Sequence, residues 1–166
     1  MSRGLLIYVM VPALGILAVL QSVVVPRLAI LHVRPNPMLL FVVGWTLFHG
    51  RREGLLWGFV GGLWLDVFSG GPMGASSLAL MAAAMVAGLG HRTLYRTNLL
   101  VPVFVTALST LSYAAVYLTI LAMLETNFPW RAMLERLAVP EVIYNGVLML
   151  LLTPLLNRIP ERREVV

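Results

Sequence analysis

Residues 51–74 read Arg51-Arg-Glu-Gly54-Leu-Leu-Trp-Gly58-Phe-Val-Gly61-Gly62-Leu-Trp-Leu-Asp66-Val-Phe-Ser-Gly70-Gly-Pro-Met-Gly74. An apolar run follows a charged triplet and ends in a glycine-rich turn, which predicts a helix over residues 54–68. Gly54, Gly58 and Gly62 recur at every fourth position and so share one helix face. That face forms a groove for a second helix, either from this chain, which is the favoured interpretation, or from a partner protein.

One carboxylate, Asp66, lies inside this apolar run, just before the turn that contains Gly70 and Gly74. An ionisable residue within a membrane helix is by default a candidate functional group. Asp66 also has a structural interpretation, because its oxygens can accept hydrogen bonds from the N–H groups of the glycine turn or of the next helix. We favour the structural role.

The composition places the chain in a membrane. Of the 166 residues, 60% are hydrophobic and 11% are charged, and the mean hydropathy is +0.90. Soluble domains are about 45–50% apolar and about 25% charged. The chain contains no cysteine, which excludes disulfides, thiolate metal sites and a cysteine nucleophile.

Six apolar stretches follow one another, at residues 4–25, 37–49, 54–68, 75–90, 99–124 and 141–156. A helix needs about 20 residues to cross the hydrocarbon, so the first and fifth are long enough on their own. The other four have lengths that also suit re-entrant or interfacial segments. We predict an all-α integral membrane protein with six transmembrane helices, forming a single transmembrane domain over residues 1–166.

The arginines orient these helices. Six crossings put eight arginines on one side of the membrane and four on the other. The first group is Arg3, Arg51, Arg52, Arg92, Arg96, Arg158, Arg162 and Arg163, and the second is Arg27, Arg34, Arg131 and Arg136. The richer side is cytoplasmic by the positive-inside rule, so both termini are predicted in the cytoplasm. A re-entrant hairpin over residues 37–68 would instead bury Arg51 and Arg52, at about 2.5–3.5 kcal/mol each.

Polar residues also gather near the outer ends of the predicted helices, where Gln21, Tyr144 and Asn145 lie. In addition, hydroxyl groups follow one face of the fifth helix, at Thr106, Ser109, Thr110, Tyr113 and Tyr117. Such a stripe usually bridges neighbouring helices, and that is the favoured interpretation. The alternative is that it lines a cavity for a lipid or a small ligand.

The outer loop has an amphipathic pattern over residues 129–138. Trp130, Met133, Leu134 and Leu137 fall at i, i+3, i+4 and i+7, and charged residues occupy the opposite face. This spacing predicts a short helix that lies in the outer membrane–water interface. Its apolar face serves either as a membrane anchor or as a surface for a periplasmic partner.

No catalytic or metal-binding constellation is present in the sequence. His49 and His91 fall at cytoplasmic helix ends and His32 outside, so the three cannot form a metal site. Phosphate-binding and dinucleotide-binding motifs are absent, and the arginines are too dispersed for a nucleic-acid surface. We therefore expect a protein that is not an enzyme and has no catalytic residues, metal or cofactor.

The chain resembles the MreD family of rod shape-determining inner-membrane proteins over nearly its whole length. Three segments carry the resemblance: Pro35-Asn-Pro37-Met-Leu-Leu, the run Arg51-Arg-Glu-Gly54 through Asp66 to Gly70-Gly-Pro-Met-Gly74, and Pro140-Glu-Val-Ile-Tyr144-Asn145 with the apolar run that follows. The central segment is the most specific of the three. Asp66, Gly70, Gly74, Tyr144 and Asn145 match the family pattern as structural or docking positions.

The resemblance implies a non-enzymatic scaffold of the cell-elongation machinery. MreD proteins work with MreC, with the actin-like MreB, and with RodA and its class B penicillin-binding transpeptidase. The family is also similar in fold to the S components of energy-coupling-factor transporters, which have six helices and both termini inside. An S component that binds a small molecule is the alternative function. Its Ala-x-x-x-Ala signature is absent here, since Leu17 follows Ala13 and Ser22 follows Ala18 at i+4.

Overall fold

The computed structural model describes residues 3–28, 35–90, 100–124, 129–134 and 138–156, and every regular element within these ranges is helical. Six helices have 13 or more residues: α1 (Arg3–Val23), α2 (Pro37–His49), α3 (Arg51–Ser69), α4 (Ala75–Gly90), α5 (Leu100–Leu124) and α7 (Val139–Leu156). A 3-10 turn η1 (Val25–Leu28) follows α1, and the four-residue α6 (Trp130–Met133) precedes α7. The predicted all-helical fold class is confirmed for the described residues.

Most helix bounds agree with the sequence, and the differences have local causes. α2 and α4 span the ranges read from the sequence. α3 begins at Arg51 instead of residue 54, because the chain turns at Gly50, whose φ of 88° permits a new helix to start at once. α7 begins at Val139, so Pro140 lies in its first turn, where a missing N–H leaves no hydrogen bond unmade.

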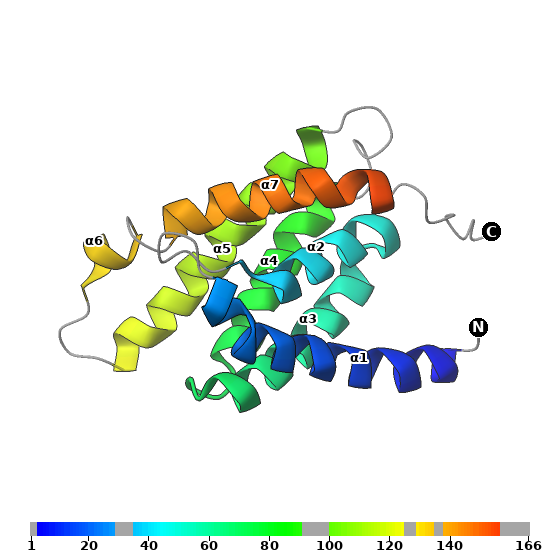
Figure 1. Cartoon of the computed structure of the whole chain (residues 1–166), viewed down its shortest axis with the longest axis horizontal. Coiled ribbons are helices and arrows are strands. Elements are labelled where there is room, and N and C mark those ends of the chain that lie inside the picture. Colours follow the sequence, from blue (N-terminus) through cyan, green and yellow to red (C-terminus); the bar gives the residue numbers. More distant parts are fainter. Residues whose placement is uncertain (1–2, 29–34, 91–99, 125–128, 135–137, 157–166) are drawn as a thin grey trace.

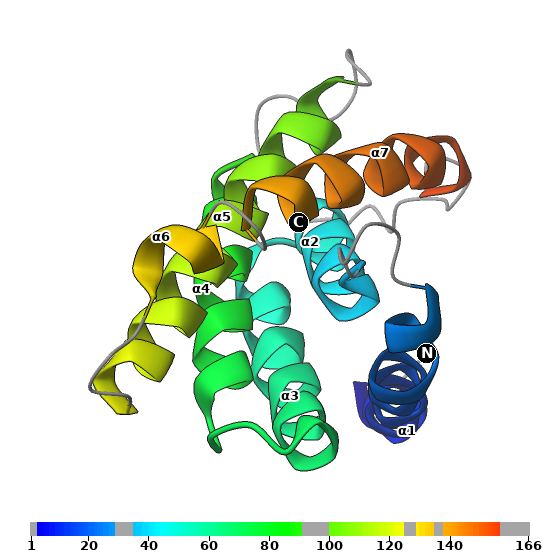
Figure 2. The same ribbon diagram turned by 60° about the vertical axis from the view of Figure 1, so that its left-hand side comes forward.

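Consecutive long helices run in alternating directions. In Figure 1, α1 and α3 both start toward the right and end toward the left. α2 and α7 run the opposite way, from left to right, and α4 also starts toward the left. We call the left-hand end the pocket end. Figure 2 shows α3 and α4 side by side as an antiparallel pair, with α1 on the outer side of α3.

The core lies around α2 and α4. The 13-residue α2 has eight buried residues, and it contacts α1, α3, α4, α5 and α7. α4 presents a row of small buried residues to its neighbours, namely Ala75, Ser76, Ala79, Ala83 and Ala87. The 13-residue α2 is thus shielded by its neighbours, which explains how an apolar helix too short to cross a bilayer alone fits in the middle of the fold.

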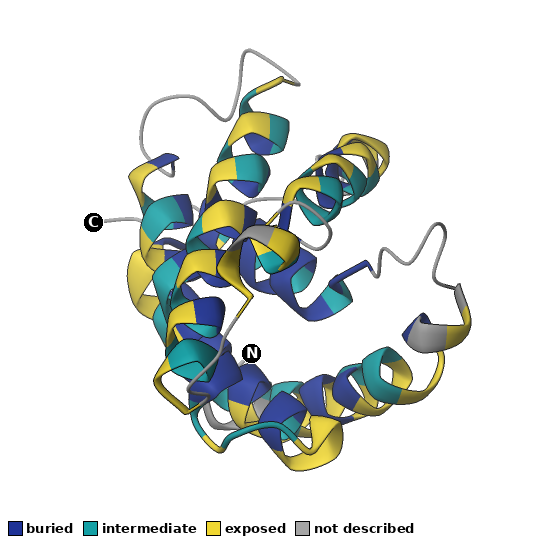
Figure 3. Cartoon of the chain, turned by 90° about the vertical axis from the view of Figure 1, so that its left-hand side faces the viewer, coloured by how far each residue is buried: buried dark blue, intermediate teal, exposed yellow. Residues whose placement is uncertain are grey.

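Large apolar side chains cover the outside of the bundle. Figure 3 shows buried residues facing the interior and exposed residues around the circumference. Among the exposed ones are Tyr8 (81%), Phe104 (70%) and Leu151 (67%). Soluble monomers rarely expose apolar surface this extensively. The described residues include two helices long and apolar enough to cross a membrane, Leu6–Val23 and Leu100–Leu124, in which only 17% and 22% of the residues are buried.

Candidate functional site

The turn between α3 and α4 is built by two glycines. Gly70 ends α3 with a left-handed backbone (φ 67°), and Gly74 precedes α4 with a φ of 91°. A side chain on either glycine would meet no atom within 4 Å, so the requirement for glycine is one of backbone conformation. This sharp reversal brings the start of α4 next to the last turn of α3.

Asp66 closes that turn from inside α3. Its Oδ2 accepts hydrogen bonds from the N–H of Gly74 (2.9 Å) and from the N–H and hydroxyl of Ser77 (3.4 and 3.2 Å), and its Oδ1 accepts from the N–H of Ser76 (2.9 Å). The side chain is only 3% exposed. It therefore serves as the N-terminal cap of α4, supplied by the neighbouring helix, and these bonds match the structural role expected from the sequence.

The glycine face of α3 is filled by this chain's own helices. A Cβ on Gly58 would lie 3.2 Å from the backbone oxygen of Leu80, and one on Gly62 would overlap the backbone of Ser77, both in α4. A Cβ on Gly54 would overlap the side chain of Thr46 in α2. The favoured sequence interpretation, packing within the bundle, describes this arrangement. The alternative, a groove at these glycines open to a partner's helix, is wrong, because α2 and α4 occupy it.

A hydrogen-bond network centred on Asn36 joins the helices at the pocket end. The Oδ1 of Asn36 caps α2 by accepting from the N–H of Leu39 (3.0 Å), and it also accepts from the Nε2 of Gln21 (3.0 Å). The Nδ2 of Asn36 donates to the Oε1 of Glu141 (3.4 Å), and its backbone N–H donates to the Oδ1 of Asn145 (3.1 Å). Asn36 is 5% exposed, so one buried amide links α1, α2 and α7.

Gln21 and Asn145 complete the network. The Oε1 of Gln21 accepts a hydrogen bond from the N–H of Met38 (2.9 Å). The side-chain amide of Gln21 therefore bonds both Asn36 and Met38 at the start of α2. The Nδ2 of Asn145 donates to the hydroxyl of Thr110 in α5 (3.4 Å). Because Asn145 is fully buried, both ends of its amide are used in joining α7 to α2 and α5.

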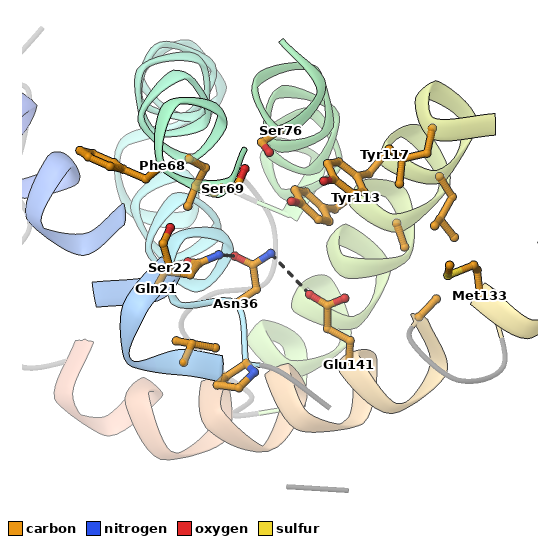
Figure 4. Close-up of a pocket in the computed structure, with 17 residues that line it drawn as sticks. Gln21, Ser22, Asn36, Phe68, Ser69, Ser76, Tyr113, Tyr117, Met133 and Glu141 are labelled. Atoms are coloured by element: carbon orange, nitrogen blue, oxygen red, sulfur yellow. Dashed lines mark hydrogen bonds between the residues drawn. The ribbon is translucent and has the colours of Figure 1, made fainter. Parts of the chain in front are cut away.

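A pocket of about 610 Å³ opens beside this network (Figure 4). Its polar side is formed by Gln21, Asn36, Ser76, Tyr113, Tyr117 and Glu141. The other side is apolar and includes Val25, Leu65, Phe68, Leu118, Leu121 and Met133. The lining comes from the ends of α1, α3 and α5 and the starts of α2, α4 and α7, together with η1 and α6. The volume is in the range of small-molecule sites, about 300–1,000 Å³.

The hydroxyl stripe of α5 divides between the two roles that the sequence left open. Thr106 and Thr110 are fully buried and donate to carbonyl oxygens one turn earlier in their own helix, those of Pro102 (2.7 Å) and Thr106 (2.8 Å). Only Thr110 also bonds a neighbouring helix, through Asn145. Tyr113 and Tyr117 line the pocket, and Figure 4 shows their hydroxyls directed toward Ser76. Bridging between helices, the favoured interpretation, therefore describes Thr110, and Tyr113 both lines the pocket and forms side-chain hydrogen bonds with Ser76 and Asn36.

Two further sequence candidates lie outside the network. Trp130 begins α6 and is 43% exposed. The predicted amphipathic helix over residues 129–138 is described only in part, because residues 135–137 lie outside the described ranges. Tyr144 is partly buried in α7 and is not among the residues that line the pocket.

Sequence reasoning missed the roles of Asn36 and Glu141. Both are polar residues at the very start of a helix, next to a proline, and such positions are usually read as caps or helix ends. Their roles depend on long-range contacts, because Asn36 bonds Glu141 and Asn145, which lie 105 and 109 residues away along the chain. Within the described residues, no group of three His, Cys, Asp or Glu side chains could hold a metal ion. The described residues that line the pocket offer hydrogen-bonding groups, one carboxylate and aromatic faces to a ligand.

The comparison with known families identifies a match over nearly the whole chain. Residues 2–159 match the family model described as rod shape-determining protein MreD. No curated protein and no solved structure matches the chain. The family is one of shape-determining membrane proteins and not a known enzyme family. Since the match covers nearly the whole chain, this protein belongs to the MreD family and has a role in determining rod shape.

Proposed function

We propose that this chain is a non-enzymatic scaffold of the cell-elongation complex, which binds MreC in the bacterial inner membrane and helps to position peptidoglycan synthesis. The observation that carries the proposal is the MreD family match over residues 2–159. Within this complex, RodA with its class B penicillin-binding transpeptidase and MreB are further candidate partners. The same match favours shape determination over the alternative of a transporter S component.

The proposal includes six membrane crossings with both termini in the cytoplasm. It is supported by the alternating helix directions, since the starts of α1 and α3 lie at one end of the bundle. Arg3, Arg51 and Arg52 belong to these helix starts, and Arg27 follows α1 at the pocket end. The pocket end is then the periplasmic end, and the arginine-rich end faces the cytoplasm.

α6 is the proposed contact for periplasmic partners. It lies at the pocket end beside α5, and Trp130 at its start is half-exposed. Half-buried tryptophans are frequent anchors at protein interfaces and at membrane surfaces. The glycine face of α3 is not part of the proposal, because α2 and α4 cover it.

The test is co-purification of a tagged chain from gently solubilised native membranes, followed by mass spectrometry. We expect MreC to be enriched together with RodA and its transpeptidase. Trp130→Ala should reduce the MreC yield several-fold, as expected for loss of one interface anchor of about 1–2 kcal/mol. Tyr8→Ala, at an 81%-exposed position on α1, is the control and should leave the yield unchanged.

Recovery of the ATPases of an energy-coupling-factor transporter in place of MreC would contradict the scaffold proposal. An unchanged MreC yield with Trp130→Ala would leave α6 as a membrane anchor and remove it from the partner surface. Equal amounts of each variant in the membrane fraction, measured by immunoblot, ensure that the yields report binding.

A further inference from the structure

The pocket at the periplasmic end has the two-sided lining of a site for an amphiphilic molecule. Hydrogen-bonding groups from Gln21, Asn36, Ser76 and Glu141 lie on one side, and apolar side chains from α3, α5 and α6 lie on the other. Pockets with a few convergent polar groups and apolar walls are the usual form of ligand sites. The charge of the polar side then decides which head group it accepts.

The ionisable group on that side is a carboxylate. Glu141 contributes the pocket's carboxylate, and within the described residues no Arg or His side chain lines the pocket. Glu141 receives hydrogen bonds from neutral amides, from the Nδ2 of Asn36 at 3.4 Å and from the side chain of Asn145. A partly buried carboxylate is costly unless a positive group pairs with it. Among the described lining residues the carboxylate therefore has no cationic partner, and a cationic head group would supply one.

Aromatic rings face the same space. Tyr113 and Tyr117 are stacked, with ring centroids 5.7 Å apart and planes inclined by 7°, and both line the pocket. Phe68 lines the opposite wall and is stacked on Trp64. Faces of aromatic rings attract ammonium groups, and this attraction strengthens when water is excluded. Tyr113 is only 9% exposed, so its ring can contact a guest within the pocket but little bulk water.

We propose that this pocket binds an organic cation, an ammonium group carried on an apolar body, with the ammonium paired to Glu141 beside the rings of Tyr113 and Tyr117. The inference goes beyond the scaffold function and does not depend on it. The ammonium can belong to a free amine or to the ethanolamine head group of a lipid, and the experiment separates these two sources.

The probes are 2-phenylethylamine, 2-phenylethanol and phenylacetate, which share an aromatic body and differ in the charge of the head group. Binding to the full chain in micelles of a neutral sugar detergent is measured by saturation-transfer NMR, with empty micelles as the blank. We expect the amine to bind more tightly than the alcohol and the acid to bind least. Glu141→Gln keeps the oxygen that accepts from Asn36, and it should weaken amine binding by about tenfold or more while leaving the alcohol unchanged.

A second variant keeps the carboxylate and removes a ring. Tyr117→Leu should weaken binding of the amine more than binding of the alcohol, because only the cation gains from the ring face. Tyr8→Leu, which removes an 81%-exposed tyrosine from α1, is the matched control and should change neither. The Tyr117 variant also keeps the proposal testable if Glu141→Gln does not fold.

The lipid source is tested by native mass spectrometry of the chain in nanodiscs that contain phosphatidylethanolamine. Retention of this lipid by the wild type, its loss in Glu141→Gln and its displacement by 2-phenylethylamine would identify the head group as the cation. Binding of 2-phenylethylamine without lipid retention would identify a free amine. Equal binding of amine and alcohol, amine binding unchanged in Glu141→Gln, tighter binding of phenylacetate, or no binding of either ammonium source would overturn the proposal.

Discussion

Asp66 shows how hydrogen bonds from backbone N–H groups can stabilise a carboxylate that is buried in an apolar bundle. Its two oxygens accept four hydrogen bonds, three of them from backbone N–H groups around the start of α4. Those N–H groups have no partner within their own helix, and the helix dipole adds a favourable positive potential. The residue type and its place before a glycine turn could be read from the sequence. Which atoms it bonds could not, because these depend on how α4 starts.

Substitution of Asp66 tests this capping role. Asp66→Asn keeps one acceptor oxygen and places an NH2 group against a backbone donor, so it should lower stability by about 1–3 kcal/mol. Asp66→Leu leaves all the N–H donors unpaired and should lower it further. The measurement is thermal unfolding in detergent, with Val67→Ala at a 57%-exposed position on α3 as the control. If Asn and Leu variants unfold at the same temperature, the charge itself is the stabilising feature.

At the same scale, Asn36 marks the limit of sequence reasoning. Its contact with the N–H of Leu39 is a local one, in which the Oδ1 of Asn36 caps the start of α2. Its bonds to Gln21, Glu141 and Asn145 join residues between 15 and 109 positions away. A local pattern contains no information about such partners, because they meet only after the helices have packed.

At the scale of elements, the α3–α4 pair depends on the absence of side chains. The repeating glycines of α3 meet the small residues of α4 so closely that Gly62 has no room for a Cβ beside Ser77. Close backbone approach provides the van der Waals contact that holds helices together where the surroundings are as apolar as the side chains. The spacing in the sequence indicated a close contact, and the fold decided that α4 and α2 are the helices that make it.

Enlarging Gly62 should separate α3 from α4. We expect Gly62→Leu to destabilise the protein strongly, by about 3 kcal/mol or more, because it overpacks a backbone contact. Leu63→Ala, one residue along and 37% exposed, should have little effect. Both are compared by the fraction of monodisperse protein on size-exclusion chromatography after heating. Normal behaviour of Gly62→Leu would mean that the two helices are not packed as closely as described.

At the scale of the whole molecule, the proposed topology puts one end of the bundle on each side of the membrane. Because the chain contains no cysteine, single cysteines report on topology without background. Ser69→Cys, at the pocket end, should react in intact cells with a maleimide that crosses the outer but not the inner membrane. Arg52→Cys, at the opposite end, should react only after lysis. Both positions are exposed. The reverse labelling pattern would contradict cytoplasmic termini.

The sequence by itself determined the class of protein, the approximate ranges of its helices and the family resemblance. These follow from composition and from spacing along the chain, which are local properties. Only the tertiary structure decided that α2 is central, that the glycine groove is filled from within and that polar residues from α1, α2, α5 and α7 meet around a pocket. The physical reason is that helix packing joins residues far apart in the chain, and the pattern within any one helix does not specify which faces will meet.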